Sequence, residues 1–369
     1  MRILQVASHL NVGGIPRYVV SLSRALALRG HDIIVASAGG SLEAELAGAS
    51  LRHARVPLKT SVEFSPQVWR STAALESLAR ETPMDVVHGH TRVGQVVMDR
   101  LARRLRLPSV ATWHGFYRRN LGRRLWPCTG DRTIAISEPV RQHLLRDFRL
   151  PESRVRLIAS GIETGRFASP VDPAEQQRLR SQHRLSASGP IVGTVSRLVE
   201  AKGVYRLIRA FAQIKTAQPS AQLLIVGDGE MRSSLERLAA ELGVAEAVRI
   251  IGSVPDTRVA LSLMSVFVFL PTDKEGFGLS LLEAMASARP IVAMQGGAGA
   301  AWLLDQLRLD PVVEADDVPG LARAVLELLG SGERACQAAG RVRALALERY
   351  DISRVAAETE AVYAEVLRR

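Results

Sequence analysis

Val266-Phe-Val-Phe-Leu270 is followed, after two residues, by Asp273-Lys-Glu-Gly-Phe-Gly-Leu-Ser-Leu-Leu-Glu-Ala-Met-Ala286. The first segment is an unbroken apolar run, which is typical of a strand buried on both faces of a parallel sheet. The second begins as a loop with two glycines and becomes a helix near Leu279. A strand, a loop and a helix in this order form the repeating unit of α/β folds, so we expect that architecture.

The loop in this stretch has the composition of a ligand site. Gly276 and Gly278 allow the backbone to approach a ligand closely, and the following helix directs unpaired N–H groups towards it, which favours an anion. Glu275 in the loop and Glu283 one turn inside the helix add acceptors for hydroxyl groups. These features predict a phosphorylated sugar or nucleotide. Ser280-Leu-Leu-Glu283 also matches a capping box, in which Glu283 would only satisfy the helix terminus.

Length and composition indicate a globular protein with two domains. A chain of 369 residues with 47% hydrophobic residues can bury two cores. It contains no run of about 18 uncharged apolar residues, and its first residues pass directly into a strand pattern, so we expect a cytoplasmic protein. Cys128 and Cys336 stand alone, which predicts two free thiols and no disulfide.

The net charge of +11 lies in the first half of the chain. Residues 1–170 carry 25 basic and 13 acidic residues, and the segment from Arg92 to Arg124 carries nine arginines against one acid, Asp99, with aromatic residues between them. This pattern fits an anionic membrane surface, nucleic acid or a phosphorylated acceptor, and it also fits a solvated basic face. The nine arginines are Arg92, Arg100, Arg103, Arg104, Arg106, Arg118, Arg119, Arg123 and Arg124.

The first half of the chain alternates apolar runs with helical patterns. After the first run, the turn Asn11-Val-Gly-Gly14 leads into a helix that ends at Gly30. The turn does not match GxGxxG, so a dinucleotide cofactor gains little support. We predict strands at residues 2–8, 32–37, 85–88, 109–112 and 133–136.

A second series of the same kind follows a polar, proline-containing segment at residues 161–188. We therefore expect an N-terminal domain at 1–170, a C-terminal domain at 186–348 and a last helix in 349–369. Both domains should be doubly wound parallel sheets, which bind ligands at the carboxyl ends of their strands. Further strands are predicted at 191–195, 222–226, 248–251, 266–270 and 290–294.

Two motifs resemble those of the retaining glycosyltransferases of family 4. Residues 275–283 resemble the Glu-x7-Glu motif of that family, and Arg197-Leu-Val-Glu-Ala-Lys202-Gly203 resembles its Arg-x4-Lys-Gly element. Matches run from Gly13 to the last helix, which resembles the helix that returns to the first domain. The resemblance implies the GT-B fold, two Rossmann-like domains facing across a cleft. It also implies transfer of a sugar from a nucleoside diphosphate sugar to an acceptor hydroxyl.

The resemblance assigns roles in the C-terminal domain. Arg197 and Lys202 would hold the donor phosphates and stabilise the leaving group, although both could be surface cations beside Glu200. Glu275 would hold the sugar, and Glu283 the ribose hydroxyls. The backbone N–H groups of Gly276, Phe277, Gly278 and Leu279 would hold the sugar and its phosphate.

Two further turns resemble nucleotide contacts of the family. In Val226-Gly-Asp-Gly-Glu230, Gly227 would let the chain pass close to the nucleotide, and a purely structural turn fits equally well. In Gly252-Ser-Val-Pro255, Val254 would contact the nucleobase. The chain departs from the family where an acid is common, since residues 296–301 read Gly-Gly-Ala-Gly-Ala-Ala.

In the N-terminal domain, Thr112-Trp-His-Gly-Phe116 resembles the His-Gly turn of the family. His114 would hydrogen-bond the donor sugar across the cleft, and a structural histidine is the alternative. Gly13 and Gly14 would face the same diphosphate. His88 and His90 could line the acceptor side, and a metal role for this pair is a weaker alternative.

Neither a metal site nor a bound cofactor is predicted. The sequence has no Asp-x-Asp motif, and Glu314-Ala-Asp-Asp317 is more typical of a solvated loop. We therefore expect a metal-independent enzyme of hexosyltransferase type with a nucleoside diphosphate sugar as its co-substrate.

The acceptor is expected to be a glycan or a lipid-linked molecule in bacterial lipopolysaccharide or surface polysaccharide assembly. The basic first domain would dock on the inner face of the cytoplasmic membrane. An epimerase or phosphorylase with the same fold is one alternative. A noncatalytic module that binds nucleic acid or a sugar nucleotide is another, although no nucleic-acid-binding motif supports it, so no nucleic-acid partner is expected.

Overall fold

A computed structural model describes residues 1–118 and 121–368, with only the backbone of Leu121. Arg119, one of the nine arginines of the basic segment, lies outside the described residues. The chain forms two compact units. Unit 1 contains Met1–Glu163 and Asp351–Arg369, and unit 2 contains Thr164–Tyr350. Each unit is described by itself.

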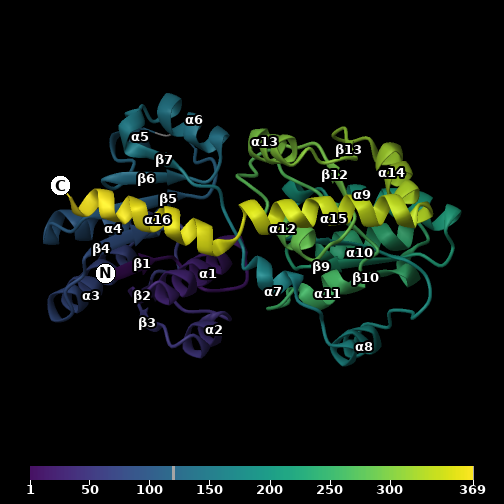
Figure 1. Ribbon diagram of the computed structural model, residues 1–369, viewed down its shortest axis with the longest axis horizontal. Coiled ribbons are helices and arrows are strands. Elements are labelled where there is room, and N and C mark those ends of the chain that lie inside the picture. Colours follow the sequence, from purple (N-terminus) through teal and green to yellow (C-terminus); the bar gives the residue numbers. More distant parts are fainter. Residues whose placement is uncertain (119–120, 369) are drawn as a thin grey trace. The chain divides into compact units, whose positions relative to one another are not determined.

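Unit 1 is built on a parallel sheet of seven strands in the order β3-β2-β1-β4-β5-β6-β7 (Figure 1). The central strands are almost wholly buried, as expected for a sheet covered by helices on both faces. The strands are β1 (Arg2–Val6), β2 (Asp32–Ser37), β3 (Arg52–Arg55), β4 (Val86–Gly89), β5 (Ser109–Trp113), β6 (Arg132–Ala135) and β7 (Val155–Leu157).

Helix α16 (Ile352–Leu367) completes unit 1 with the last residues of the chain. Asp351 is its N-cap residue, and the Asp351 side chain accepts a hydrogen bond of 2.9 Å from the N–H of Ser353. It packs against α1 (Gly14–Leu28) and β5, and Figure 1 shows it in yellow. The other helices of unit 1 are α2 (Glu43–Gly48), α3 (Pro66–Glu81), α4 (Arg92–Leu105), α5 (Leu121–Leu125), α6 (Glu138–Asp147) and the 3-10 turn Glu152–Arg154.

Unit 2 is built on a parallel sheet of six strands in the order β10-β9-β8-β11-β12-β13. The strands are β8 (Ile191–Val195), β9 (Gln222–Val226), β10 (Val248–Ile250), β11 (Val266–Phe269), β12 (Ile291–Met294) and β13 (Val312–Val313). The helices are α7 (Thr164–Ala168), α8 (Pro173–Gln182), α9 (Val204–Ala217), α10 (Arg232–Glu241), α11 (Arg258–Leu263), α12 (Leu279–Ala286), α13 (Ala298–Leu307), α14 (Val318–Gly330) and α15 (Gly332–Arg349), with 3-10 turns at Glu200–Lys202 and Ala245–Ala247.

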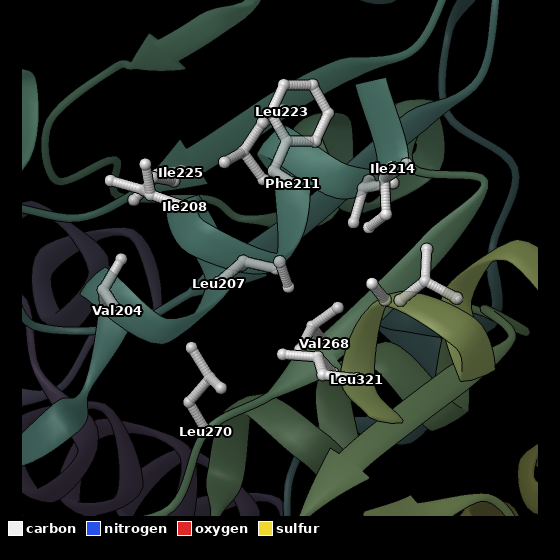
Figure 2. Close-up of a cluster of buried hydrophobic side chains, with 14 of the residues drawn as sticks. Val204, Leu207, Ile208, Phe211, Ile214, Leu223, Ile225, Val268, Leu270 and Leu321 are labelled. Carbon is white, nitrogen blue, oxygen red and sulfur yellow. The ribbon is translucent and has the colours of Figure 1, made fainter. Parts of the chain in front are cut away.

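The core of unit 2 fixes the start of α9. The apolar face of α9, including Leu207 and Phe211, is fully buried against Leu223 of β9 and Leu321 of α14 (Figure 2). Burial of such a side chain contributes about 1.5–3 kcal/mol, so several of them hold the helix firmly on the sheet. The loop that joins β8 to α9 is therefore anchored at both ends.

The strand order places ligand-binding loops in the same way in both units. The order reverses between β1 and β4 in unit 1 and between β8 and β11 in unit 2. Parallel doubly wound sheets bind ligands outside the carboxyl ends of the strands at such a reversal. The predicted fold class, two Rossmann-like parallel-sheet domains of the GT-B type, is confirmed.

Candidate active site

The predicted donor-site residues of unit 2 follow four neighbouring strands. Arg197 follows β8, Gly227 follows β9, Val254 follows β10, and the loop 273–278 follows β11. Because these strands are parallel and adjacent in the sheet, their loops emerge at one edge. The structure thus brings the loops together, although the side chains differ in what they contact.

Backbone hydrogen bonds fasten the loop after β8 to the turn after β9. The N–H of Leu198 donates to the carbonyl of Asp228 at 2.9 Å, and the N–H of Met231 donates to the carbonyl of Leu198 at 2.9 Å. A Cβ on Gly227, which has φ of +146°, would lie 1.8 Å from the carbonyl oxygen of Ser196. Glycine is therefore required at position 227 by packing alone.

Lys202 and Glu275 connect the loops on either side of the strand reversal. The Nζ of Lys202 donates a hydrogen bond to Oε2 of Glu275, and both side chains are mostly buried. Gly203, with φ of +58°, turns the chain from the 3-10 segment into α9 directly after Lys202. Arg197 is exposed and forms no ion pair within residues 1–118 and 121–368. The structure thus joins Lys202 to Glu275 and leaves the guanidinium of Arg197 facing solvent.

The N-terminus of α12 has no side-chain cap. Its N-cap residue is Gly278, with φ of +127°, and a Cβ there would lie 2.8 Å from the ring of Phe269. The N–H groups of the first turn therefore lack a side-chain acceptor from the cap position. Phe277 is 2% exposed and packs against Trp302, with ring centroids 6.2 Å apart. Phe277 can reach a ligand only through its backbone.

Glu283 lies inside α12 and is 9% exposed. Its Oε2 accepts a hydrogen bond of 2.9 Å from the hydroxyl of Thr257, which directly precedes α11. The capping-box interpretation of Ser280 and Glu283 is wrong, because the helix begins at Leu279 and Ser280 is its second residue. Glu283 instead supports the segment that follows Val254.

The glycines after β12 make close backbone contacts that were not predicted from the sequence. A Cβ on Gly297 would lie 1.8 Å from the carbonyl oxygen of Asp273, and one on Gly299 would lie 2.1 Å from that of Glu275. The two loops therefore pack backbone against backbone. The departure from the family pattern at 296–301 supplied a signal, because three glycines in four residues after a strand indicate close backbone approach.

In unit 1, His114 is joined to other buried polar side chains. Its Nε2 lies 3.3 Å from Nδ1 of His90, and Nε2 of His90 is hydrogen-bonded to Oε1 of Gln5. The amide nitrogen of Gln5 donates to the hydroxyl of Tyr363 on α16 at 3.1 Å. That hydroxyl lies 2.7 Å from Nδ1 of His88. Both ring nitrogens of His90 are thus engaged by protein groups.

These histidines are uncharged at neutral pH. Burial lowers the pKa values of His88 and His114 to about 3 and lowers the pKa of His90 well below its usual value. Nε2 of His88 lies 2.8 Å from the hydroxyl of Thr112, so both of its ring nitrogens also have partners. Across the ranges 1–118 and 121–368, no three His, Cys, Asp or Glu residues are grouped as metal ligands.

Gly13 and Gly14 form the start of α1. Gly13 is the N-cap residue with an extended backbone, and the helix begins at Gly14, two residues before Pro16. A Cβ on Gly13 would meet Pro16 at 3.7 Å, an ordinary contact, so packing does not require glycine there. Gly13, like Gly278, has no side chain with which to cap its helix.

The basic segment of unit 1 is partly neutralised by Asp99 within it and by Glu63 and Glu76 outside it. Arg92 and Arg123 both bind Glu63, at 2.8 and 2.7 Å. The guanidinium of Arg100 lies 3.4 Å from the ring centroid of Trp69. Arg103 pairs with Asp99, and Arg104 pairs with Glu76.

Four large apolar side chains are exposed beside these arginines. They are Val62, Phe64, Trp69 and Leu125, which are 59%, 63%, 50% and 77% exposed. The ring of Phe64 lies 5.9 Å from that of Trp126, and Arg100 contacts the rings of both Trp69 and Trp126. We call Val62, Phe64, Trp69, Leu125, Arg123 and Arg124 the aromatic–arginine face; Arg100 itself is buried.

Both halves of the chain match families of known proteins. Residues 189–331 match the family described as "Glycosyl transferases group 1", and residues 12–166 match "Glycosyltransferase Family 4". The chain is a family 4 glycosyltransferase.

Two curated relatives of this glycosyltransferase differ in how much of the chain they match. It is 34% identical over 193 residues to a GDP-mannose-dependent alpha-(1-6)-phosphatidylinositol monomannoside mannosyltransferase of Mycolicibacterium smegmatis. That alignment spans about half the length of each protein, 50% of both. It is 25% identical to an N-acetyl-alpha-D-glucosaminyl L-malate synthase of Bacillus anthracis, over 98% of this chain and 97% of the relative.

A solved structure shows the same fold over nearly the whole chain. Anabaena Alr3699/HepE in complex with UDP and glucose superimposes with a TM-score of 0.82 at 19% identity, covering 98% of this chain and 99% of that one.

Proposed function

We propose that this glycosyltransferase transfers a sugar from a nucleoside diphosphate sugar to an acceptor hydroxyl, with retention of the anomeric configuration. The observation that carries the proposal is the contact between Lys202 and Glu275 at the strand reversal of unit 2. A cation and a hydroxyl acceptor meet there on the loops that lead into α9 and into the uncapped end of α12. A diphosphate linked to a sugar presents the complementary groups.

In this proposal Lys202 and Arg197 bind the donor diphosphate. Lys202 can turn from Glu275 to a phosphate oxygen, and the exposed Arg197 adds a guanidinium that can hold two phosphate oxygens. Glu275, once released, accepts hydrogen bonds from sugar hydroxyls. The N–H groups of residues 276–279 face the phosphate, Glu283 accepts from the ribose, and the backbone of Val254 borders the base.

The proposed reaction needs no side-chain nucleophile. The bond from the anomeric carbon to the phosphate oxygen breaks, and a bond forms from that carbon to the acceptor oxygen. The acceptor proton moves to an oxygen of the leaving phosphate. Arg197 and Lys202 stabilise the charge that develops on the nucleoside diphosphate, without a metal ion. His114, with Gly13 and Gly14, is proposed to contact the donor from unit 1.

The test combines donor binding with analysis of the product. Thermal shifts against UDP, GDP, ADP and CDP sugars identify the donor, because a ligand that binds only the folded state raises its stability. NMR of the product then gives the anomeric configuration. Inversion would contradict the retaining mechanism, release of a sugar phosphate would indicate a phosphorylase, and an acceptor-independent change of the sugar would indicate an epimerase.

We further propose that the aromatic–arginine face docks on an anionic membrane that carries a lipid-linked acceptor, in lipopolysaccharide or surface polysaccharide assembly. Exposed aromatic and aliphatic side chains insert between head groups, while arginines bind lipid phosphates. A relative named for a phosphatidylinositol monomannoside substrate supports a lipid acceptor. No helix in residues 1–118 and 121–368 is both long and apolar enough to span a bilayer.

Sedimentation with liposomes tests this docking. The wild type should pellet with vesicles that contain anionic lipid and be released as salt rises. Replacing Phe64 and Leu125 by serine should abolish pelleting. Leu28→Ser is the matched control, because Leu28 is 90% exposed on α1 and lies outside the face. Equal recovery of all proteins in the supernatant, together with a salt-sensitive DNA shift, would favour a nucleic-acid partner.

A further inference from the structure

The buried hydrogen bonds of unit 1 form one chain from α16 to His114. This series of hydrogen bonds runs from Tyr363 through Gln5 and His90 to His114. The first three side chains are fully buried, and His114 is partly exposed. A branch leads from Tyr363 to His88 and on to Thr112. Gln5 lies on β1 and His88 on β4, two central strands, and His90 directly follows β4. These hydrogen bonds therefore cross the buried centre of the sheet.

Each hydrogen bond in this chain has a defined direction. The amide nitrogen of Gln5 donates to the hydroxyl of Tyr363, which holds the amide with its carbonyl oxygen towards His90. The carbonyl oxygen of Gln5 can only accept, so Nε2 of His90 carries a hydrogen. Because His90 is neutral, its Nδ1 is an acceptor.

The direction of the chain decides the state of the His114 ring. Nδ1 of His90 can accept only if Nε2 of His114 carries the hydrogen. In a neutral imidazole the other nitrogen is then an acceptor. Tyr18 packs edge-on against the same ring, with centroids 4.9 Å apart. The ring of His114 is thus held in orientation by Tyr18 and in tautomeric form by His90.

We propose that Tyr363 and Gln5 are positioning residues that hold His114 in its Nε2–H form, so that Nδ1 accepts a hydrogen bond from a hydroxyl of the donor sugar. The proposal rests on the proposed contact of His114 with that sugar. Tyr363 touches no substrate and acts through Gln5 and His90. Without its hydroxyl, the amide of Gln5 is free to turn over, which would reverse the direction of every bond as far as His114.

Turnover of Tyr363→Phe gives the first test. The substitution keeps the ring and removes only the hydroxyl, and we expect kcat to fall roughly tenfold while KM for the acceptor is unchanged. Thr359→Val is the matched control. Thr359 is also fully buried on α16, one turn earlier, and its hydroxyl has no hydrogen-bond partner among residues 1–118 and 121–368. It should leave kcat unchanged.

A double-mutant cycle separates positioning from general stability. In a His114→Ala background, Tyr363→Phe should have no further effect on kcat, because the residue that it positions is gone. A tenfold loss that persists in that background would overturn the proposal. If His114→Ala alone left kcat normal, the proposed sugar contact of His114 would fail instead.

Nitrogen NMR of the histidine rings gives a readout independent of activity. In the wild type, His114 should show a protonated Nε2 and an unprotonated Nδ1. In Tyr363→Phe both tautomers should appear, and in Thr359→Val the wild-type form should remain. A protonated Nδ1 on His114 in the wild type, or an unchanged tautomer in Tyr363→Phe, would overturn the proposal.

Discussion

Unit 1 presents uncharged groups at the carboxyl ends of its strands, whereas unit 2 presents charged ones. The first six strand positions follow the same order in both sheets. In unit 1 the polar groups are neutral histidines held by hydrogen bonds to buried uncharged side chains. In unit 2 they are Lys202, Glu275 and Arg197, with an uncapped helix end beside them. The same topology thus supports two opposite kinds of electrostatic environment.

The difference follows from what surrounds each group. His88 lies on β4 in the middle of a sheet and His90 directly follows that strand, and burial disfavours a charge on either side chain. Lys202 and Glu275 lie on loops beyond the strand ends and keep some contact with water. A site that must hold a diphosphate needs the second environment, and one that orients a neutral sugar can use the first.

The largest expected effect concerns the shape of the unit 2 loops. Gly227→Ala places a Cβ against the carbonyl of Ser196 at a φ that L-residues rarely adopt. We expect unit 2 to lose about 3–4 kcal/mol of stability, measured by urea unfolding. Gly340→Ala is the control, since nothing lies within 4 Å of a Cβ at this α15 position and alanine favours the helix. Equal stability of the two variants would show that the turn is not tightly packed.

The next effect concerns the charges of unit 2. Lys202→Ala and Glu275→Ala should each lower turnover at least roughly 100-fold, a loss of about 2.7 kcal/mol in transition-state stabilisation, while the fold remains intact. Lys274→Ala is the matched control, because Lys274 is an exposed cation in the same loop. Near-normal turnover of either test variant would contradict the proposed donor site.

A smaller effect concerns the neutrality of unit 1. The pKa of His88 is about 3 in the folded state and 6.5 in the unfolded chain, so only the unfolded state gains a proton as the pH falls below 6.5. The contribution of His88 to the free energy of unfolding is therefore fully present above pH 6.5 and is lost as the pH falls towards 3. Between pH 7.5 and 5, the wild type should lose about 2 kcal/mol more than His88→Asn.

Tryptophan fluorescence can follow this loss, because Trp69, Trp113 and Trp126 belong to unit 1 and only Trp302 belongs to unit 2. Parallel pH profiles of the wild type and His88→Asn would mean that His88 is charged in the folded protein.

The smallest effect concerns the attachment of α16 to unit 1. Asp351→Ala removes the cap of this helix and should destabilise unit 1 by about 1 kcal/mol. Asp351→Asn should retain most of the stability, since an amide oxygen can accept the same hydrogen bond from Ser353. Thermal unfolding followed by tryptophan fluorescence measures the stability of both variants. An equal loss of stability in the two would show that the charge of Asp351, and not its hydrogen bond to Ser353, stabilises the helix.

Periodicity predicted the long strands well because apolar runs such as Ile191–Val195 and Gln222–Val226 are buried on both faces. It missed β3, β7 and β13. β3 reads Arg-His-Ala-Arg at the edge of the sheet, where no apolar pattern is needed, and the other two have three and two residues. Short edge strands carry too little pattern to detect.

The sequence indicated where the loops of unit 2 meet, but it did not reveal their contacts. That Lys202 would pair with Glu275 depends on β8 and β11 being neighbours, which the fold supplies. The role of Tyr363 could not be foreseen at all, since it lies 358 residues from Gln5. Such pairings depend on how distant segments pack, and a single sequence does not encode them locally.

The two-part construction of unit 1 has a consequence for protein synthesis. Gln5 leaves the ribosome early, and Tyr363 follows 358 residues later, which takes roughly 20–70 s at ordinary rates of translation. During that interval the surface of α1 that later meets α16 is bare in the nascent protein. Unit 1 is therefore the first unit whose synthesis begins and the last to be completed. Until α16 has been made, the exposed surface of α1 offers chaperones an apolar binding surface.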